Sequence, residues 1–131
     1  MALVHAVIAL ALIEFFVFGA LVGRARALYK VEAPAVSGHP LFERYYRVHY
    51  NTMEQLLCFV PGMLLFATYL SASWAAALGL LFIVGRIVYL RGYVADPKKR
   101  GAGFGLSALP VMILLLGGLG GALASWLRQG G

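Results

Sequence analysis

Three polar residues recur at helical spacing within a largely apolar part of the chain. Arg47, Asn51 and Glu54 are separated by four and then three residues, which places them on one face of an α-helix. An arginine side chain suits a carboxylate, which it can bind through two parallel hydrogen bonds. An ionised glutamate only accepts hydrogen bonds, so it suits an ammonium group. This face therefore has the chemistry to bind a small molecule that carries both charges.

A second stripe of polar residues follows further along the chain. Arg86, Tyr89 and Tyr93 are separated by three and then four residues and again share one helical face, and Arg100 comes soon after them. If the two stripes face each other, they enclose a polar cleft with several cationic groups and one carboxylate. A small zwitterion with excess negative charge fits such a cleft.

The composition places these stripes in an integral membrane protein. The chain has 131 residues, of which 62% are hydrophobic and 12% charged, and its mean hydropathy is +0.85. A soluble domain carries about 25% charged residues. Ionisable side chains inside membrane segments are costly, and they are candidates for a functional site by default.

The basic residues give the expected orientation in the membrane. Ten of the eleven Lys and Arg residues flank two junctions between apolar segments. A one-sided excess of this kind marks the cytoplasmic face. The net charge of +6 does not indicate nucleic-acid binding, because these residues border membrane segments and no recognition module accompanies them. The ten residues are Arg24, Arg26, Lys30, Arg44, Arg47, Arg86, Arg91, Lys98, Lys99 and Arg100.

We predict a single domain over residues 1–131, built as an all-α membrane protein with four transmembrane helices. A spanning helix needs about 20 apolar residues, and the uncharged stretch from Gln55 to Gly85 is too long for one helix. Ser71 within it is a plausible N-cap that starts a new helix. Both basic loops then lie on one side, and both termini on the other. The predicted helices cover residues 3–29, 42–70, 73–95 and 103–127.

The two stripes also carry a family resemblance. The segment from Phe42 to Glu54 resembles the Phe-Glu-Arg…Arg-x-x-x-Asn-x-x-Glu signature of the membrane-associated proteins in eicosanoid and glutathione metabolism, the MAPEG family. The segment from Arg86 to Tyr93, followed by Arg100, is similar to that family's Arg-x-x-Tyr-x-x-Gly-Tyr…Arg signature. The resemblance covers nearly the whole chain and implies a homotrimer of four-helix subunits, with glutathione bound between neighbouring subunits near the cytoplasmic face.

The resemblance assigns roles to individual residues. It implies that Arg100 lies next to the thiol of glutathione and activates it as a thiolate, with no metal involved. Ala27 departs from the pattern, because the leukotriene synthase has a second arginine there, so a general glutathione transferase is favoured. The residues that the resemblance implies for glutathione binding are Arg26, Arg47, His49, Asn51, Glu54, Tyr89 and Tyr93.

The predicted function is a membrane-bound glutathione transferase whose thiolate attacks hydrophobic electrophiles or lipid hydroperoxides. Its expected partners are glutathione, a hydrophobic substrate, membrane lipids and further copies of the chain. The short chain favours a bacterial inner membrane, with the basic loops in the cytoplasm. A non-catalytic, lipid-binding member of the same family is an alternative.

Glu14 motivates the remaining alternative. It is a lone carboxylate near the middle of the first apolar segment, and it resembles the proton-coupled carboxylate of small four-helix multidrug transporters. Its expected depth matches that of Arg86, however, since it lies about 18 Å from the end of the helix at 1.5 Å per residue. We therefore favour a structural ion pair between Glu14 and Arg86.

Overall fold

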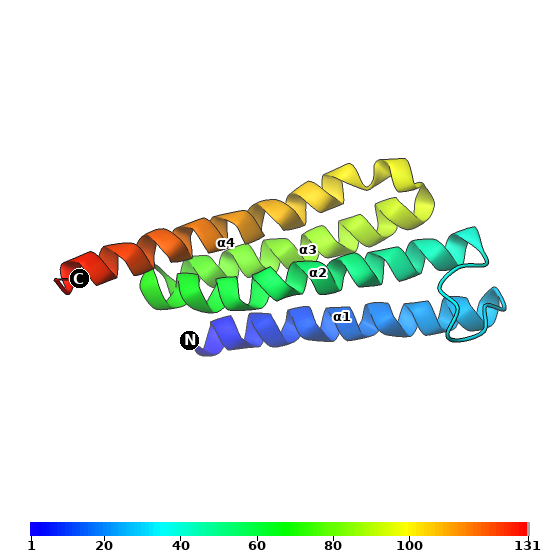
Figure 1. Cartoon of the computed structure of the whole chain (residues 1–131), viewed down its shortest axis with the longest axis horizontal. Coiled ribbons are helices and arrows are strands. Elements are labelled where there is room, and N and C mark those ends of the chain that lie inside the picture. The colour runs from blue at the N-terminus through cyan, green and yellow to red at the C-terminus, as the bar shows by residue number, and fades with distance from the viewer. Residues whose placement is uncertain (131) are drawn as a thin grey trace.

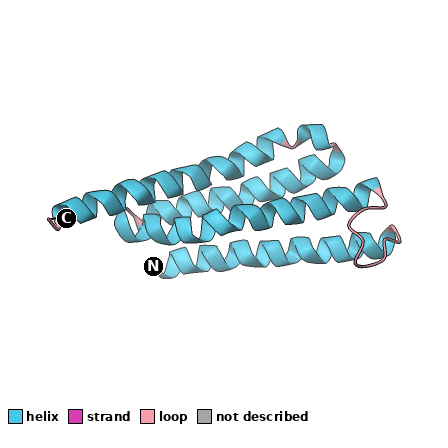
Figure 2. Cartoon of the chain, viewed as in Figure 1, coloured by secondary structure: helices cyan, strands magenta, loops and turns pink. Residues whose placement is uncertain are grey.

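The computed structural model describes residues 1–130, and this part of the chain contains four long α-helices, one short 3₁₀ helix and no strand. The predicted all-α, four-helix fold is confirmed (Figures 1 and 2). Each long helix begins and ends within two residues of its predicted bounds. The elements are α1 (Ala2–Leu28), α2 (Pro40–Tyr69), α3 (Ala72–Ala95), η1 (Pro97–Lys99) and α4 (Gly101–Arg128).

Local hydrogen bonds define the starts of α2 and α3. The side chain of His39 accepts a hydrogen bond of 3.1 Å from the backbone N–H of Leu41, and Pro40 occupies the first turn, where a missing N–H costs nothing. This cap starts α2 two residues earlier than predicted. The hydroxyl of Ser71 accepts a hydrogen bond of 3.1 Å from the backbone N–H of Trp74, so the predicted N-cap of α3 is confirmed.

The helices lie side by side along one long axis (Figure 1). The loop between α1 and α2 and the connection through η1 lie at one end of the bundle, whereas both termini and the turn between α2 and α3 lie toward the other. The basic residues predicted for the two connections therefore gather at a single end. This arrangement is the one that the charge distribution predicted.

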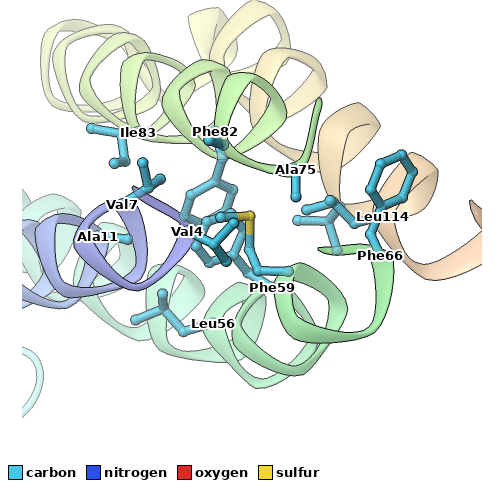
Figure 3. Packing of buried hydrophobic residues seen from close by; sticks show 13 residues of the cluster. Val4, Val7, Ala11, Leu56, Phe59, Phe66, Ala75, Phe82, Ile83 and Leu114 are labelled. Carbon is cyan, nitrogen blue, oxygen red and sulfur yellow. The ribbon is translucent and has the colours of Figure 1, made fainter. Parts of the chain in front are cut away.

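A mainly aliphatic and aromatic core joins α1, α2, α3 and α4 (Figure 3). The rings of Phe59 and Phe82 stack with their centroids 4.0 Å apart, and Met63 is fully buried beside them. Two glycines bring α4 close to α3: a Cβ atom on Gly85 would lie 2.7 Å from the Leu106 carbonyl carbon, and one on Gly103 would overlap the Tyr89 backbone. These close approaches hold the first turns of α4 against the second half of α3.

The outer surface is suited to lipid. Side chains as large as Phe16, Leu57 and Trp74 are 79%, 72% and 69% exposed, and apolar exposure on this scale is typical of a membrane protein. Three helices are long and apolar enough to cross a membrane, namely Ala2–Leu28, Ala72–Ala95 and the segment Pro97–Arg128. The 30-residue α2 is long enough, but its first half carries the polar stripe.

Candidate functional site

A polar cleft lies between α2, α3 and the start of α4. Its volume is about 320 Å³, and it contains six of the eight residues predicted to bind or activate glutathione. Two predicted residues, Arg26 and His49, lie elsewhere. The cleft is lined by Arg47, Tyr50, Asn51, Glu54, Tyr89, Tyr93 and Arg100.

The α2 wall of the cleft supplies both signs of charge. Arg47 and Glu54 are exposed and Asn51 is half-buried, all on the face that the spacing of the stripe predicted. Tyr50 is also part of this wall and extends it toward the α1–α2 loop, where it borders a second hollow. This wall can hold a carboxylate at one point and an ammonium group two helical turns away.

The α3 wall supplies hydroxyl groups from two tyrosines. The rings of Tyr89 and Tyr93 have centroids 5.6 Å apart and are tilted by 48°. Tyr89 is only 4% exposed, and its ring also meets Phe104 of α4 at 6.3 Å. These neighbours limit the movement of the Tyr89 ring, whose hydroxyl can donate or accept a hydrogen bond in the cleft.

Arg86 does not line the cleft, which corrects the expectation that its guanidinium shares a polar surface with the two tyrosines. It is fully buried behind the cleft. Its Nη1 donates hydrogen bonds of 2.8 Å to Oδ1 of Asn51 and 3.2 Å to Oγ1 of Thr52, and its Cζ lies 4.2 Å from the centre of the Tyr89 ring. The long side chain carries its charge into the bundle, where it contacts residues of both cleft walls.

The predicted partner of Arg86 is not in direct contact with it. Both carboxylate oxygens of Glu14 are buried without a hydrogen-bond partner among the described residues, as are Nε and Nη2 of Arg86. A hydrogen-bonded ion pair is therefore not formed within the subunit, and a structural role for these opposite charges stays a prediction.

Arg26 and His49 face other parts of the subunit. Nη1 of Arg26 donates hydrogen bonds to the backbone oxygens of Val31 (3.3 Å) and Ala35 (2.8 Å) in the α1–α2 loop. The ring of His49 stacks on Phe15 of α1 at a centroid distance of 4.4 Å. Neither side chain borders the cleft of its own subunit.

Arg44 makes a contact between α2 and α3 that the sequence did not predict. Its Nη1 donates hydrogen bonds of 2.9 Å and 3.5 Å to the backbone oxygens of Val94 and Ala95, the last residues of α3. Arg100 follows η1, where its Nη1 donates a hydrogen bond of 2.8 Å to the backbone oxygen of Pro97. Arg44 thus ties α2 to the segment that carries Arg100. The only signal in the sequence was the position of Arg44 at a helix end beside the stripe.

An apolar groove adjoins the polar cleft at Glu54. It lies between α2 and α4, has a volume of about 310 Å³, and opens on the outer surface of the bundle. Glu54 borders both spaces, so a polar ligand in the cleft and an apolar ligand in the groove would be neighbours. No group of three or more His, Cys, Asp or Glu side chains within residues 1–130 could hold a metal ion. The groove is lined by Glu54, Gln55, Cys58, Ala108, Val111, Met112, Leu115 and Leu116.

The chain is similar to several known proteins. The profile of the MAPEG family matches residues 3–120. An uncharacterised protein of Synechocystis sp. is 49% identical over 85% of this chain and 81% of its own length. Human microsomal glutathione S-transferase 2 is 41% identical over 79% of this chain and 71% of its own, and guinea pig leukotriene C4 synthase is 33% identical over 79% and 69%.

Proposed function

Because this chain belongs to the MAPEG family, whose glutathione-conjugating members are among its relatives, we propose that it is a membrane-bound glutathione transferase. It binds glutathione in the polar cleft between α2 and α3 and activates the thiol as a thiolate. The thiolate then attacks a hydrophobic electrophile supplied by the bilayer.

The observation that carries this proposal is the set of charges in one cleft. Glutathione has two carboxylates, one ammonium group and two amide groups. Arg47 and Arg100 are the cleft's cations, Glu54 is its carboxylate, and the tyrosines and Asn51 add neutral hydrogen-bonding groups. Arginine suits a carboxylate because its planar guanidinium can donate two parallel hydrogen bonds. Glu54 would pair with the γ-glutamyl ammonium.

Arg100 is proposed as the group that stabilises the thiolate. A free thiol has a pKa near 8.5, and lowering it by about two units requires roughly 2.7 kcal/mol of differential stabilisation. One guanidinium next to sulfur in a partly dry site supplies energy of this order. In conjugation the thiolate sulfur donates an electron pair to the electrophilic carbon, forming a C–S bond as the leaving group departs with its own electron pair. The proton lost from the thiol goes to solvent.

The apolar groove beside Glu54 is the proposed approach of the second substrate. It opens on the outer surface of the bundle, and an apolar electrophile would enter it from the membrane. Its lining is almost entirely aliphatic, apart from Glu54 and Gln55. Such a surface selects by hydrophobicity more than by a particular functional group. We therefore propose a broad class of hydrophobic electrophiles, with lipid hydroperoxides among them. With a hydroperoxide the thiolate attacks the terminal peroxide oxygen, the O–O bond breaks and the lipid alcohol leaves, and a second glutathione converts the resulting sulfenic acid to glutathione disulfide and water.

The proposed assembly is a homotrimer with the basic end of each subunit in the cytoplasm, in a bacterial inner membrane. Arg47, Glu54 and Arg100 are exposed in the single subunit, which supports a cleft that is closed by a neighbouring copy. Arg26 would act from that copy, because it borders a separate hollow at the end of α1. We do not extend this role to His49, since it packs on Phe15 inside its own subunit.

A proton-coupled transporter remains the second candidate, and the buried carboxylate of Glu14 without a hydrogen-bond partner favours it. The experiment that separates the two is a glutathione titration of the detergent-purified protein, with the ultraviolet absorbance of the thiolate as the readout. Saturable thiolate formation at neutral pH supports the transferase. Absence of glutathione binding, together with proton-coupled drug efflux by cells that express the protein, would establish the transporter instead.

A further inference from the structure

The hydrogen bond between Arg86 and Asn51 has a fixed polarity. A guanidinium group has only donors, so the atom of Asn51 that lies 2.8 Å from Nη1 must accept and is the amide oxygen. The oxygen and nitrogen of an asparagine amide are otherwise nearly interchangeable in shape, and the amide can turn over to suit its partners. With its oxygen held by Arg86, the amide of Asn51 has two N–H donors left for the cleft.

Arg86 is itself held so that it cannot follow a moving amide. Its second acceptor is Oγ1 of Thr52, whose hydroxyl hydrogen is donated to the backbone oxygen of Val48 at 2.8 Å. The lone pairs of that oxygen are therefore free to accept from Arg86. The Arg86 side chain is fully buried, with its charge over the face of Tyr89. Both acceptors belong to α2, so the guanidinium is fixed relative to the wall of the cleft.

We propose that Arg86 is a positioning residue that locks the Asn51 amide, so that its NH₂ group faces the cleft and selects a hydrogen-bond acceptor on the ligand. The acceptor is a carbonyl or carboxylate oxygen. This inference rests on the proposed function, since glutathione is the ligand whose peptide and carboxylate oxygens would meet Asn51. It gives Arg86 a role in ligand selection although the residue does not border the cleft.

Arginine suits this role better than a neutral donor would. A glutamine or serine at the same place could present either a donor or an acceptor, and the Asn51 amide could then turn over. A guanidinium stays charged when it is desolvated, so it enforces one orientation at every physiological pH. The contribution of the Asn51 hydrogen bond to ligand affinity should therefore not change with pH.

The first test reverses the polarity of residue 51 and leaves Arg86 intact. In Asn51→Asp, one carboxylate oxygen satisfies Arg86 and the other presents a negative acceptor to the cleft. We expect this variant to bind glutathione less tightly than Asn51→Ala, and about tenfold or more below wild type, because a hydrogen bond is replaced by repulsion. Wild-type affinity or better in Asn51→Asp would overturn the proposal, because residue 51 would then be accepting from the ligand.

The second test is a double-mutant cycle on glutathione affinity with Arg86→Met and Asn51→Ala. If Arg86 acts through Asn51, Arg86→Met weakens binding about tenfold in the wild-type background and less than about twofold when Asn51 is already alanine. A purely structural role would instead give the same loss in both backgrounds, which would overturn the proposal. Arg91→Met is the matched control, because Arg91 is exposed on the same helix.

The outcomes separate this inference from the function on which it rests. Wild-type protein that fails to bind glutathione would overturn the proposed function and this inference with it. Wild-type binding with an additive cycle would overturn the positioning role alone. If Arg86→Met cannot be purified as a folded protein, Arg86→Gln takes its place in the cycle, because glutamine keeps a polar side chain at this position but can accept as well as donate and so no longer fixes the orientation of the Asn51 amide.

Discussion

Nη1 of Arg44 donates a hydrogen bond of 2.9 Å to the backbone oxygen of Val94, and this contact spans 50 residues of sequence. It joins the first turns of α2 to the last turn of α3, where the chain turns through η1 toward Arg100. Helix C-termini leave backbone oxygens without partners inside the helix, and a guanidinium satisfies one here. The position of Arg100 relative to the α2 wall of the cleft therefore depends on Arg44.

We expect Arg44→Met to lower turnover more than glutathione affinity. A hydrogen bond from a charged group contributes about 1.5–3 kcal/mol, and its loss should loosen η1 while the α2 wall stays intact. The thermal midpoint of the detergent-solubilised protein should fall as well. Arg24→Met is the control, since Arg24 is an exposed cation at the same end of the bundle. Equal turnover in the Arg44 and Arg24 variants would contradict a positioning role for Arg44.

Glu54→Gln should weaken glutathione binding about tenfold to a hundredfold, which corresponds to the loss of one charge-assisted hydrogen bond. Glu54 is exposed in the subunit, so we expect less than the cost of an unpaired charge in a fully buried site. Calorimetric titration measures the effect directly. Glu43→Gln is the control, because Glu43 accepts a hydrogen bond from Gly38 in the α1–α2 loop and does not border the cleft. Unchanged affinity in Glu54→Gln would remove Glu54 from the site.

Arg100→Ala should retain most glutathione affinity, because the five other cleft residues that we propose to bind glutathione would still hold the peptide. Without the guanidinium, the pKa of the bound thiol rises toward its free value near 8.5. The loss of turnover should therefore be largest at neutral pH and shrink as the pH approaches and passes that value, where hydroxide forms the thiolate unaided. An interaction made only with the reactive form lowers turnover more than affinity.

A pH–rate profile distinguishes this outcome from simple loss of binding. Arg47→Ala serves as the comparison and should lose affinity across the whole pH range, because Arg47 pairs with a carboxylate that is ionised throughout. If the profile of Arg100→Ala instead runs parallel to that of wild type, with affinity alone reduced, thiolate activation belongs to another cation. Arg26 of a neighbouring subunit would then be the first to examine.

Glu14→Gln should lower thermal stability while leaving glutathione affinity within a few-fold. Both oxygens of Glu14 and the Nε and Nη2 atoms of Arg86 are buried without a hydrogen-bond partner in residues 1–130, so each residue is the other's proposed source of electrostatic compensation. Removing the carboxylate leaves the buried guanidinium with less electrostatic compensation, which lowers the stability of the folded protein. Glu32→Gln in the exposed loop is the control. Unchanged stability combined with loss of proton-coupled drug efflux would instead support the transporter.

The sequence by itself determined the helices and the two polar stripes. Long apolar stretches, a serine cap and a one-sided set of basic residues depend on local chain geometry and on the thickness of a bilayer, so they could be read without a structure. The stripe of Arg47, Asn51 and Glu54 follows from 3.6 residues per turn. The same spacing places His49 on the opposite side of the helix, because it lies two residues, or about 200°, from both Arg47 and Asn51. In the structure His49 faces α1 and not the cleft.

Only the tertiary structure decided how deep each polar group lies and which groups meet. Arg86 shares a helical face with Tyr89 and Tyr93, yet its guanidinium is buried behind them, because a long side chain can reach Asn51 and Thr52 on another helix. Arg26 could equally reach a ligand or its own loop, and it contacts the loop. Which group a long side chain contacts depends on the distance and the rotation between the helices. For α3 and α4, the close approach at Gly85 and Gly103 sets both the distance and the rotation. The distance and the rotation between two helices cannot be predicted from the periodicity of the sequence.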